Sequence, residues 1–355
     1  MNTISIIMAG FAMLGAADRL IGDRFGLGKE FEKGFKLFGD LALSMIGMII
    51  IAPLLADLLG PMFELFWRML HIDPSIIPAS VFAIDMGGAP LAVEVAASEQ
   101  MGKFNGLVVA SMMGGTVSFV IPYSLNVAKK EKHKWLLLGL LCGVVTIPLG
   151  CLVAGMMLGI PLGSLIYNML PLILLSILIA IGLLRAPDFC TRVFGGVGLI
   201  IKLLITLGLG LGVLRFLTGV EIIKGLETIE EATMICLSCC AIMSGAFPML
   251  NILSRVLSRP LEKMRVGLGI NDKASVGLIS TLAANITAIN MMNEMDDKGI
   301  TLNAAFAVSA GCAFADHLAY TLAFDADYLA PMVVGKLVAG VLSVVVAAFI
   351  YRRNR

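Results

Sequence analysis

The sequence predicts an all-α polytopic membrane protein built from two inverted structural repeats, which one linking helix joins. Three observations predict this fold class: an apolar composition, a series of helix-length apolar stretches, and a pattern that recurs about two hundred residues later. Hydrophobic residues make up 59% of the 355 residues and charged residues only 14%, whereas soluble domains average about 45–50% and about 25%. Such a chain needs lipid as its solvent, and its net charge of +1 gives no reason to expect a nucleic acid as partner.

The apolar stretches are the first element of this prediction. A helix needs about 20 apolar residues to cross a bilayer. Nine stretches approach or reach that length, the first of them short: 3–17, 41–59, 107–127, 135–157, 165–184, 196–217, 232–254, 301–323 and 329–350. No basic segment precedes residues 3–17, and the stretch has a counterpart later in the chain. We therefore interpret it as a membrane helix and not as a signal peptide.

Two further apolar stretches, 76–97 and 274–293, are interrupted by polar residues, and the first also by glycine and proline. Lysine and arginine gather in five connections, which lie at 19–36, 129–134, 185–192, 255–265 and 352–355. These connections fall on one side of the membrane only if both interrupted stretches enter and leave by the same face, as the positive-inside rule requires. We therefore predict two re-entrant hairpins, with the amino terminus outside and the carboxyl terminus in the cytoplasm. The expected location is the bacterial cytoplasmic (inner) membrane.

The recurring pattern predicts how the helices are organised. Corresponding residues occur in the same order in both halves of the chain: Arg19 and Arg215, Pro53 and Pro248, Asp85 and Asn285, Glu94 and Glu294, Tyr123 and Tyr320, Gly139 and Gly335. Residues 1–158 form the first predicted repeat and 188–355 the second, each with about four transmembrane helices and a hairpin. The transmembrane helix within 159–187 joins them, and an odd number of crossings inverts one repeat relative to the other. This architecture is typical of secondary transporters, which bind their substrate between the repeats near the bilayer midplane.

The tip of the first predicted hairpin reads Asp85-Met86-Gly87-Gly88-Ala89-Pro90. Gly87 and Gly88 permit a tight reversal of the chain and leave backbone groups open to a ligand. A carboxylate at the bilayer centre costs about 2.5–3.5 kcal/mol on insertion scales, so Asp85 needs a cationic partner or a water-filled cavity. The alternative is that Asp85 caps the second leg of the hairpin. We predict that Asp85, Gly87 and Gly88 contact the substrate.

The second tip offers neutral donors and acceptors, from Asn285, Thr287 and Asn290. These residues are candidates for substrate binding, although hydrogen bonds between helices explain them equally well. Asp316, within the predicted span 301–323, is a second candidate counter-ion for a cation. The adjacent His317 could relay a proton, but a bond to a neighbouring group is the favoured interpretation.

Two tyrosines and two lysines complete the candidates. Tyr123 and Tyr320 correspond in the repeat and could offer their ring faces to a cation, although aromatic packing or anchoring at the membrane interface explains them equally well. Lys202 and Lys336 lie within a turn or two of helix ends, so we expect their side chains to extend to the surface. A CxxCC cluster at residues 236–240 has no histidine at ligand spacing and is interpreted as helix packing. We predict no metal and no cofactor.

Four segments of the sequence, taken together, resemble the bacterial ethanolamine-utilisation permeases. They are the opening MNTISIIMAGFAMLGAADRLIGDRFGLGKEFEKGF, the hairpin DMGGAPLA, the segment AANITAINMMNEM and the stretch CAFADHLAYT. The resemblance runs essentially from end to end. It implies a transporter or facilitator, not an enzyme, that takes up ethanolamine as a small-molecule substrate. It implies no particular site residues, so the candidates above rest on the sequence alone.

Ethanolamine fits the candidate residues. Its primary amine is largely protonated at neutral pH, as that of lysine is. Asp85 or Asp316 can bind the ammonium group, and Asn285, Thr287 and Asn290 can bind the hydroxyl group. We hypothesise that the two tips clamp the substrate near the midplane and that alternating access follows. The sequence is compatible with a homo-oligomer and indicates no number of copies.

Two other functions are compatible with these features. One is a membrane subunit of a sodium-pumping decarboxylase, which also combines inverted repeats with hairpins; a sodium requirement and a copurifying carboxylase would favour it. The other is a channel or a receptor-like scaffold. Saturable counterflow of labelled substrate distinguishes a carrier from both.

Overall fold

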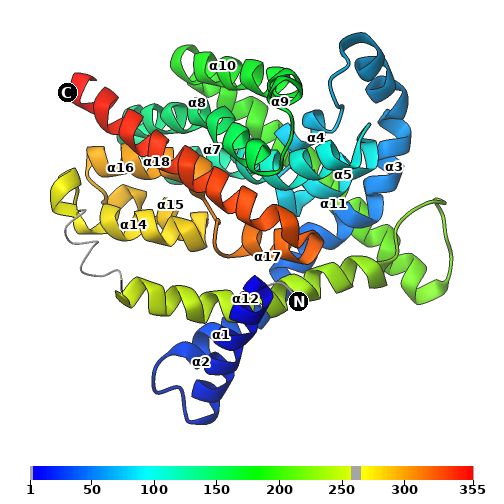
Figure 1. Cartoon of the computed structure of the whole chain (residues 1–355), viewed down its shortest axis with the longest axis horizontal. Coiled ribbons are helices and arrows are strands. Elements are labelled where there is room, and N and C mark those ends of the chain that lie inside the picture. Colours follow the sequence, from blue (N-terminus) through cyan, green and yellow to red (C-terminus); the bar gives the residue numbers. More distant parts are fainter. Residues whose placement is uncertain (1–2, 257–264, 355) are drawn as a thin grey trace.

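The computed structural model describes residues 3–256 and 265–354, and within these ranges every regular element is a helix (Figure 1). Part of the fourth basic cluster, with Arg259 and Lys263, lies outside the described residues. The elements of the first part of the chain are α1 Thr3–Leu20, α2 Leu27–Lys36, α3 Phe38–Leu70, α4 Ile76–Val81, α5 Gly88–Val95, α6 Glu99–Lys103, α7 Ile121–Val127 and α8 His133–Met157. The remaining elements are α9 Leu162–Asn168, α10 Leu170–Arg185, α11 Pro187–Thr218, α12 Ile229–Val256, α14 Asp272–Ala283, α15 Asn285–Asn290, α16 Asp297–Ala310, α17 Asp316–Phe324 and α18 Leu329–Asn354.

Seven helical segments of the described residues are long and apolar enough to cross a membrane, and an eighth is added if α9 and α10, bent by 44°, form one span. This confirms the prediction of an all-helical polytopic membrane protein. α3 extends from Phe38 to Leu70 and is longer than the predicted span 41–59. The predicted span 107–127 belongs to a helical run from Glu99 to Val127, in which Phe104–Gly114 and Thr116–Val120 are π-helical.

The prediction of one helix over 301–323 is wrong, because α16 ends at Ala310 and α17 begins at Asp316. Gly311 follows α16, and Cys312 has a left-handed conformation with φ 58°. Backbone groups freed by this break need other partners when they are buried. The N–H groups of Cys312 and Phe314 donate to the carbonyl oxygens of Thr281 and Leu282 at 2.8 and 3.0 Å. The end of α14 thus replaces the hydrogen bonds that a continuous helix would have made.

Both interrupted stretches form short helices that cannot cross a bilayer individually. In the first, α4 has 6 residues and α5 has 8, so each is only about 10 Å long at 1.5 Å per residue. In the second, α14 has 12 residues and α15 has 6. In each stretch the two short helices contact one another. Figure 1 shows α14 and α15 beneath α16 at the left of the molecule, and α4 and α5 near α3 at the right.

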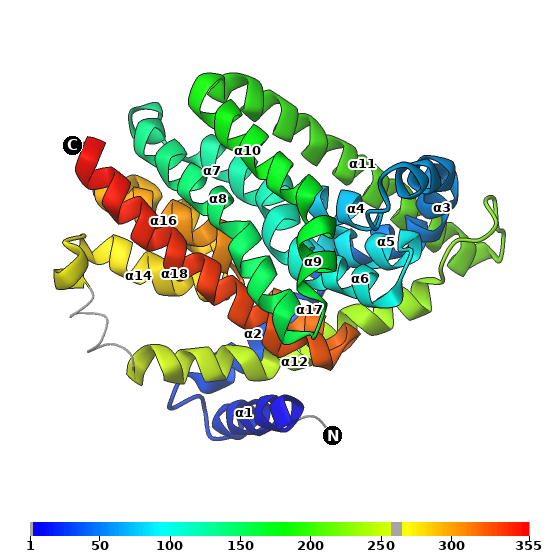
Figure 2. The same cartoon turned by 45° about the horizontal axis from the view of Figure 1, so that its top comes forward.

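Long helices from the two parts of the chain lie against each other. α11 contacts α3, α1 contacts α12, and α8 contacts α18, and Figure 2 shows α8 beside α18. Glycine permits these close approaches. A Cβ on Gly335 would lie 2.7 Å from the carbonyl oxygen of Gly150, and a Cβ on Gly150 would clash with the carbonyl oxygen of Gly335. The two helices therefore meet backbone to backbone.

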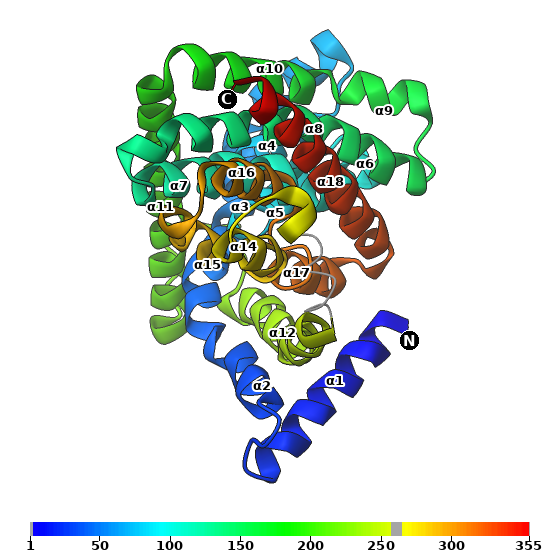
Figure 3. The ribbon, with the colours of Figure 1, turned by 90° about the vertical axis from the view of Figure 1, so that its left-hand side faces the viewer.

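α1 and α2 form a V-shaped projection that leaves the body of the molecule (Figure 3). The carboxylate of Asp18, at the end of α1, accepts hydrogen bonds from the N–H groups of Phe25, Leu27 and Gly28 at 2.8 to 3.1 Å. These bonds satisfy backbone donors at the start of α2, where no intrahelical partner exists. A Cβ on Gly34 of α2 would clash with the backbone of Ser244, so α2 packs tightly on α12.

Candidate functional site

A cavity of about 180 Å³ lies where both interrupted stretches meet the break between α16 and α17. The first stretch contributes Asp85 and its neighbours, and the second contributes Asn285 and its neighbours. The break contributes Asp316 and His317. The fourth wall is the helical run that contains both π-helical stretches, through Ser111, Met112 and Gly115. Four chain segments distant in sequence thus surround one space.

The first tip positions Asp85 through an unusual turn. Ile84–Met86 form a single 3₁₀ turn, and Gly87 follows with φ 99°, a conformation that favours glycine. The carbonyl oxygen of Ala83 accepts from the N–H groups of Met86 and Gly88 at 3.0 and 2.8 Å. A Cβ at Gly87 would clash with Met48 and one at Gly88 with the carbonyl of Phe82. The two predicted glycines therefore shape the turn and do not line the cavity.

The capping alternative for Asp85 is not what the structure shows. Gly87 is the N-cap of α5, and no side chain makes a capping hydrogen bond there. The carboxylate of Asp85 instead faces the cavity and a narrower space that it shares with Asp316, Cys239 and Tyr320.

The second tip brings only one of its three predicted residues to the cavity. Asn285 is 6% exposed, and its Oδ1 has no hydrogen-bond partner. Its amide lies against Gly311, where a Cβ would clash with it. Thr287 and Asn290 are exposed and do not line the cavity. The structure therefore separates these two from the other candidates.

The predicted tyrosines occupy different surroundings. The hydroxyl of Tyr123 donates to Oδ1 of Asn290 at 2.9 Å, and its ring stacks on Phe119 at 5.0 Å. Phe119 lines the cavity, but Tyr123 does not. Tyr320 is 1% exposed, its ring stacks on Phe324, and its hydroxyl has no hydrogen-bond partner. Only Tyr320 of the pair is close to both aspartates.

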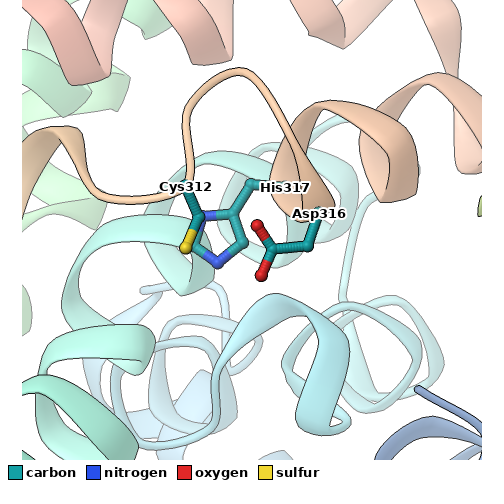
Figure 4. Close-up of side chains that lie close together, drawn as sticks. All are labelled: Cys312, Asp316 and His317. Atoms are coloured by element: carbon teal, nitrogen blue, oxygen red, sulfur yellow. The ribbon is translucent and has the colours of Figure 1, made fainter. Parts of the chain in front are cut away.

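Three side chains at the break carry groups that could bind a cation. Figure 4 shows the carboxylate of Asp316, the ring of His317 and the thiol of Cys312 gathered below the loop between α16 and α17. One ligand atom from each lies within 4.8 Å of the others, and Oδ1 of Asp316 has no hydrogen-bond partner. The set resembles a metal site in its donor types. What stands on the other side of His317 argues against a metal ion.

The group on the other side of the His317 ring is the ammonium group of Lys336 of α18, a residue whose side chain was expected to extend to the surface. The expectation is wrong, because Lys336 is only 1% exposed. Its ammonium group donates to the carbonyl oxygen of Ser111 at 2.5 Å and to Nδ1 of His317 at 2.9 Å. A positive charge already in contact with the imidazole disfavours a metal ion on the same ring. Lys202, the other lysine of this expectation, is exposed as predicted.

The sequence did not indicate Lys336 as a site residue, because Lys336 lies only about two turns from the start of α18. One signal could have found it. The repeat predicted from the sequence pairs Gly139 with Gly335, so its equivalent of Lys336 is Leu140, which is completely buried. If the two positions correspond, the burial of Leu140 predicts that Lys336 is buried as well and does not extend to the membrane surface.

Comparison with known proteins identifies the family. The chain matches the family described as "Ethanolamine utilisation protein, EutH" over residues 1–350. It is 40% identical over 352 residues to a Listeria monocytogenes protein named "Probable ethanolamine permease EutH", an alignment that covers 99% of this chain and 94% of the relative. It is 36% identical over 382 residues to an Escherichia coli protein with the same name, with 97% and 94% covered. A Bacillus subtilis protein named "Uncharacterized protein YxeR" is 35% identical over 348 residues, with 98% and 94% covered.

No solved structure matches this chain. The names of the Listeria and Escherichia coli relatives indicate a permease, which is a membrane transporter and not an enzyme. The match covers nearly the whole chain, and the resemblance noted in the sequence is confirmed. The chain belongs to the EutH family of ethanolamine utilisation proteins.

Proposed function

We propose that the protein takes up ethanolamine across the bacterial inner membrane and binds its ammonium group between Asp85 and Asp316. One observation carries the proposal: two carboxylates, from separate parts of the chain, face one cavity in the interior of an otherwise apolar protein. Carboxylates inside a membrane protein mark substrate or ion pathways, because they are costly unless they have a partner. The name of the family and the names of two relatives indicate ethanolamine as the substrate.

The cavity suits ethanolamine in size and in the groups it offers. Since one water occupies about 30 Å³ of liquid, a space of about 180 Å³ holds a molecule with four non-hydrogen atoms and some water. The free Oδ1 of Asp316 can accept from the ammonium group. The amide of Asn285, whose Oδ1 is also unpaired, can bind the hydroxyl group as donor or acceptor.

The remaining candidates take indirect roles in this proposal. Gly87 and Gly88 fix the turn that presents Asp85. Tyr320 lies beside both aspartates and limits the site on that side. Thr287, Asn290 and Tyr123 do not line the cavity in this conformation, and the hydrogen bond from Tyr123 to Asn290 joins α7 to α15. We therefore assign the direct contacts to Asp85, Asn285 and Asp316.

We further propose that residues 1–158 and 188–355 are inverted repeats whose relative movement gives alternating access. The reciprocal packing of α11 on α3 and of α1 on α12 supports this, because each first helix contacts the second long helix of the other repeat. The interrupted stretches then act as re-entrant hairpins. Contacts at or beside the basic clusters support a shared cytoplasmic side. Arg255 of the fourth cluster donates to the carbonyl of Phe25 in the first, and the ring of Trp135, just after the second cluster, lies 4.9 Å from that of Tyr351, just before the fifth. The amino terminus is then outside.

The decarboxylase alternative has no support, since the Listeria and Escherichia coli relatives are named probable permeases. A channel or scaffold remains a different outcome of the same experiment. Purified protein in proteoliposomes preloaded with unlabelled ethanolamine should accumulate labelled ethanolamine transiently and saturably. A channel gives flux that does not saturate in this way, and a scaffold gives none.

The site residues are tested in the same assay. Asp85→Asn and Asp316→Asn should each reduce counterflow by at least about tenfold, since each removes a buried charge partner of the ammonium group. Glu94→Gln is the matched control, because Glu94 is an exposed carboxylate on α5 outside the cavity. Normal counterflow in both aspartate variants would show that the cavity is not the binding site.

A further inference from the structure

Lys336 is a buried cation that the proposed function does not use. It lies on α18 and is 1% exposed, and it is among the largest fully buried side chains of the described residues. Charged side chains are almost never buried to this extent unless they are paired. Its two close contacts, the carbonyl of Ser111 and Nδ1 of His317, are both neutral acceptors. The charge that balances Lys336 must therefore lie farther away.

The π-helical segment supplies one of these acceptors. At Gly115 the backbone N–H donates to the carbonyls of Ala110 and Met112 and not to that of Ser111, its partner in a regular α-helix. The Ser111 carbonyl accepts a hydrogen bond from Lys336. π-Helical turns often occur at functional sites because they redirect backbone groups in this way.

The other acceptor defines the state of His317. An ammonium group has three donors and no acceptor, so Nδ1 of His317 must contribute a lone pair to the contact at 2.9 Å. The proton of the ring is then on Nε2, and the imidazole is neutral. A metal ion at Nε2 would need the lone pair that this proton occupies. His317 thus adds no charge to the cavity that it lines.

The balancing charges are those of Asp85 and Asp316. Lys336 contacts Ser111 and His317, which line the same cavity as both carboxylates. Within the described ranges, however, no carboxylate oxygen lies within the 4.0 Å of an ion pair with it. Ser111 and His317 line the cavity, whereas Lys336 stands behind them. It therefore contributes its charge to the site without occupying the space of a ligand.

We infer that Lys336 is the built-in counter-ion of the site and sets its capacity to one monovalent cation. Two carboxylates and one ammonium group leave one negative charge, which a single protonated amine neutralises. No sodium ion is then needed to complete the charge balance. The inference rests on the proposed function and deepens it: the transporter takes an organic monocation without an inorganic cation as partner.

The test compares three variants with the full-length protein in proteoliposomes. Uptake of labelled ethanolamine is measured in sodium chloride, in potassium chloride and in sucrose of equal osmolarity. Lys336→Met removes the ammonium group and leaves a stem of similar shape. Asp316→Asn removes one carboxylate. The double variant Asp316→Asn/Lys336→Met restores a single negative charge. Lys202→Met is the matched control, because it removes an exposed lysine from another membrane helix.

The unaltered protein and Lys202→Met should take up ethanolamine equally in all three media. Lys336→Met should lose at least about tenfold in sucrose, as expected when a buried charge loses its partner, and should regain uptake in sodium or potassium chloride. The double variant should take up more ethanolamine in sucrose than either single variant, because it restores a single negative charge, although it does not restore the contact of Asp316 with the ammonium group. A residue with a purely structural role would not show this recovery.

Three results would overturn the inference. They are a sodium requirement of the unaltered protein, full uptake by Lys336→Met in sucrose, or a double variant no better than the worse single one. If Lys336→Met does not fold, judged by size-exclusion chromatography, the double variant decides: sodium-independent uptake supports the inference, and failure to fold or to transport rejects it. Failure of the unaltered protein to transport ethanolamine in every medium instead rejects the proposed function, so the two failures are distinguishable.

Discussion

Each interrupted stretch contains a short helix that ends inside the protein, and the two stretches accommodate the carbonyl group near that end by different means. In the first, the carbonyl of Phe82 lies against Gly114 of an uninterrupted π-helical segment, and a Cβ there would overlap it. In the second, the equivalent carbonyl of Leu282 accepts from the N–H of Phe314, in a helix that is broken. A carbonyl group at the end of a short helix at membrane depth must either be packed closely or receive a hydrogen-bond donor. Gly114 permits the close packing in the first stretch, and the break between α16 and α17 supplies the donor in the second.

The charged groups also differ between the two proposed repeats. In the proposed correspondence, Asp85 of the first stretch pairs with Asn285 of the second, and Lys336 pairs with Leu140. The break places Asp316 and His317 at the start of α17, facing the cavity. One half thus contributes a single carboxylate, and the other contributes the remaining charged groups. The two halves of the chain therefore contribute unequally to the site, although we propose that they are structural repeats.

The largest effect is expected from exchanging the two tip residues. Asp85→Asn/Asn285→Asp keeps the composition and moves the carboxylate to the other half. We expect loss of ethanolamine counterflow by about two orders of magnitude, because the ammonium group loses a charge-assisted hydrogen bond and the Asn285 site gains an unpaired charge. The measurement is counterflow in proteoliposomes. Retained counterflow would mean that the carboxylate can stand at either tip, and it would contradict the proposed difference between the two tips.

Gly115 and Gly311, which the proposed repeat pairs, should respond differently to substitution by alanine. A Cβ at Gly311 would clash with the amide of Asn285, whereas at Gly115 the nearest atom would be Cε1 of His317 at 3.8 Å, an ordinary contact. We expect Gly311→Ala to destabilise the protein by about 1–3 kcal/mol through overpacking and to weaken ethanolamine binding. Gly115→Ala should change little and serves as the control. Thermal unfolding with and without ethanolamine measures both, and equal behaviour of the two variants would contradict the difference in packing.

A smaller effect is expected at the contact between α8 and α18, which correspond in the proposed repeat. Gly150→Ala introduces a methyl group against the carbonyl of Gly335. Helix association in membranes depends on such close packing of small residues. We expect a lower midpoint of thermal unfolding in detergent, with ethanolamine affinity per folded molecule largely kept. Gly163→Ala, at a position with open space around its Cβ, is the control. An unchanged midpoint for Gly150→Ala would show that the helices separate at little cost.

The smallest effect is expected at the hydrogen bond between Tyr123 and Asn290. Tyr123→Phe removes a partly exposed bond, and such a bond contributes about 0.5–1.5 kcal/mol. Because neither residue lines the cavity, the affinity for ethanolamine should stay within about threefold of the original. Binding of labelled ethanolamine to purified protein measures this. A large loss of affinity would return Tyr123 to the set of direct contacts.

The sequence predicted the helical membrane class, because that class depends on composition and on runs of apolar residues. It also predicted Asp85, Asn285 and Asp316 as candidates, and the structure brings these to one cavity. It did not predict the break at Gly311, since GCAFAD is apolar enough to continue a helix and the break depends on hydrogen bonds to the distant Thr281. The expectation that the side chain of Lys336 extends to the surface is wrong for a related reason. Its depth is set by contacts with Ser111 and His317, not by its distance from the helix end.

The central claim is that the two tips and the helix break form one site for a protonated amine. An experimental structure determined with ethanolamine tests it most directly. We predict density for one small molecule in the cavity, with its amine nitrogen within hydrogen-bond distance of Asp85 or Asp316 and its oxygen near Asn285. Density for ethanolamine elsewhere, for example in the open groove beside Trp67 and Glu94, with only water between the two aspartates, would contradict the account.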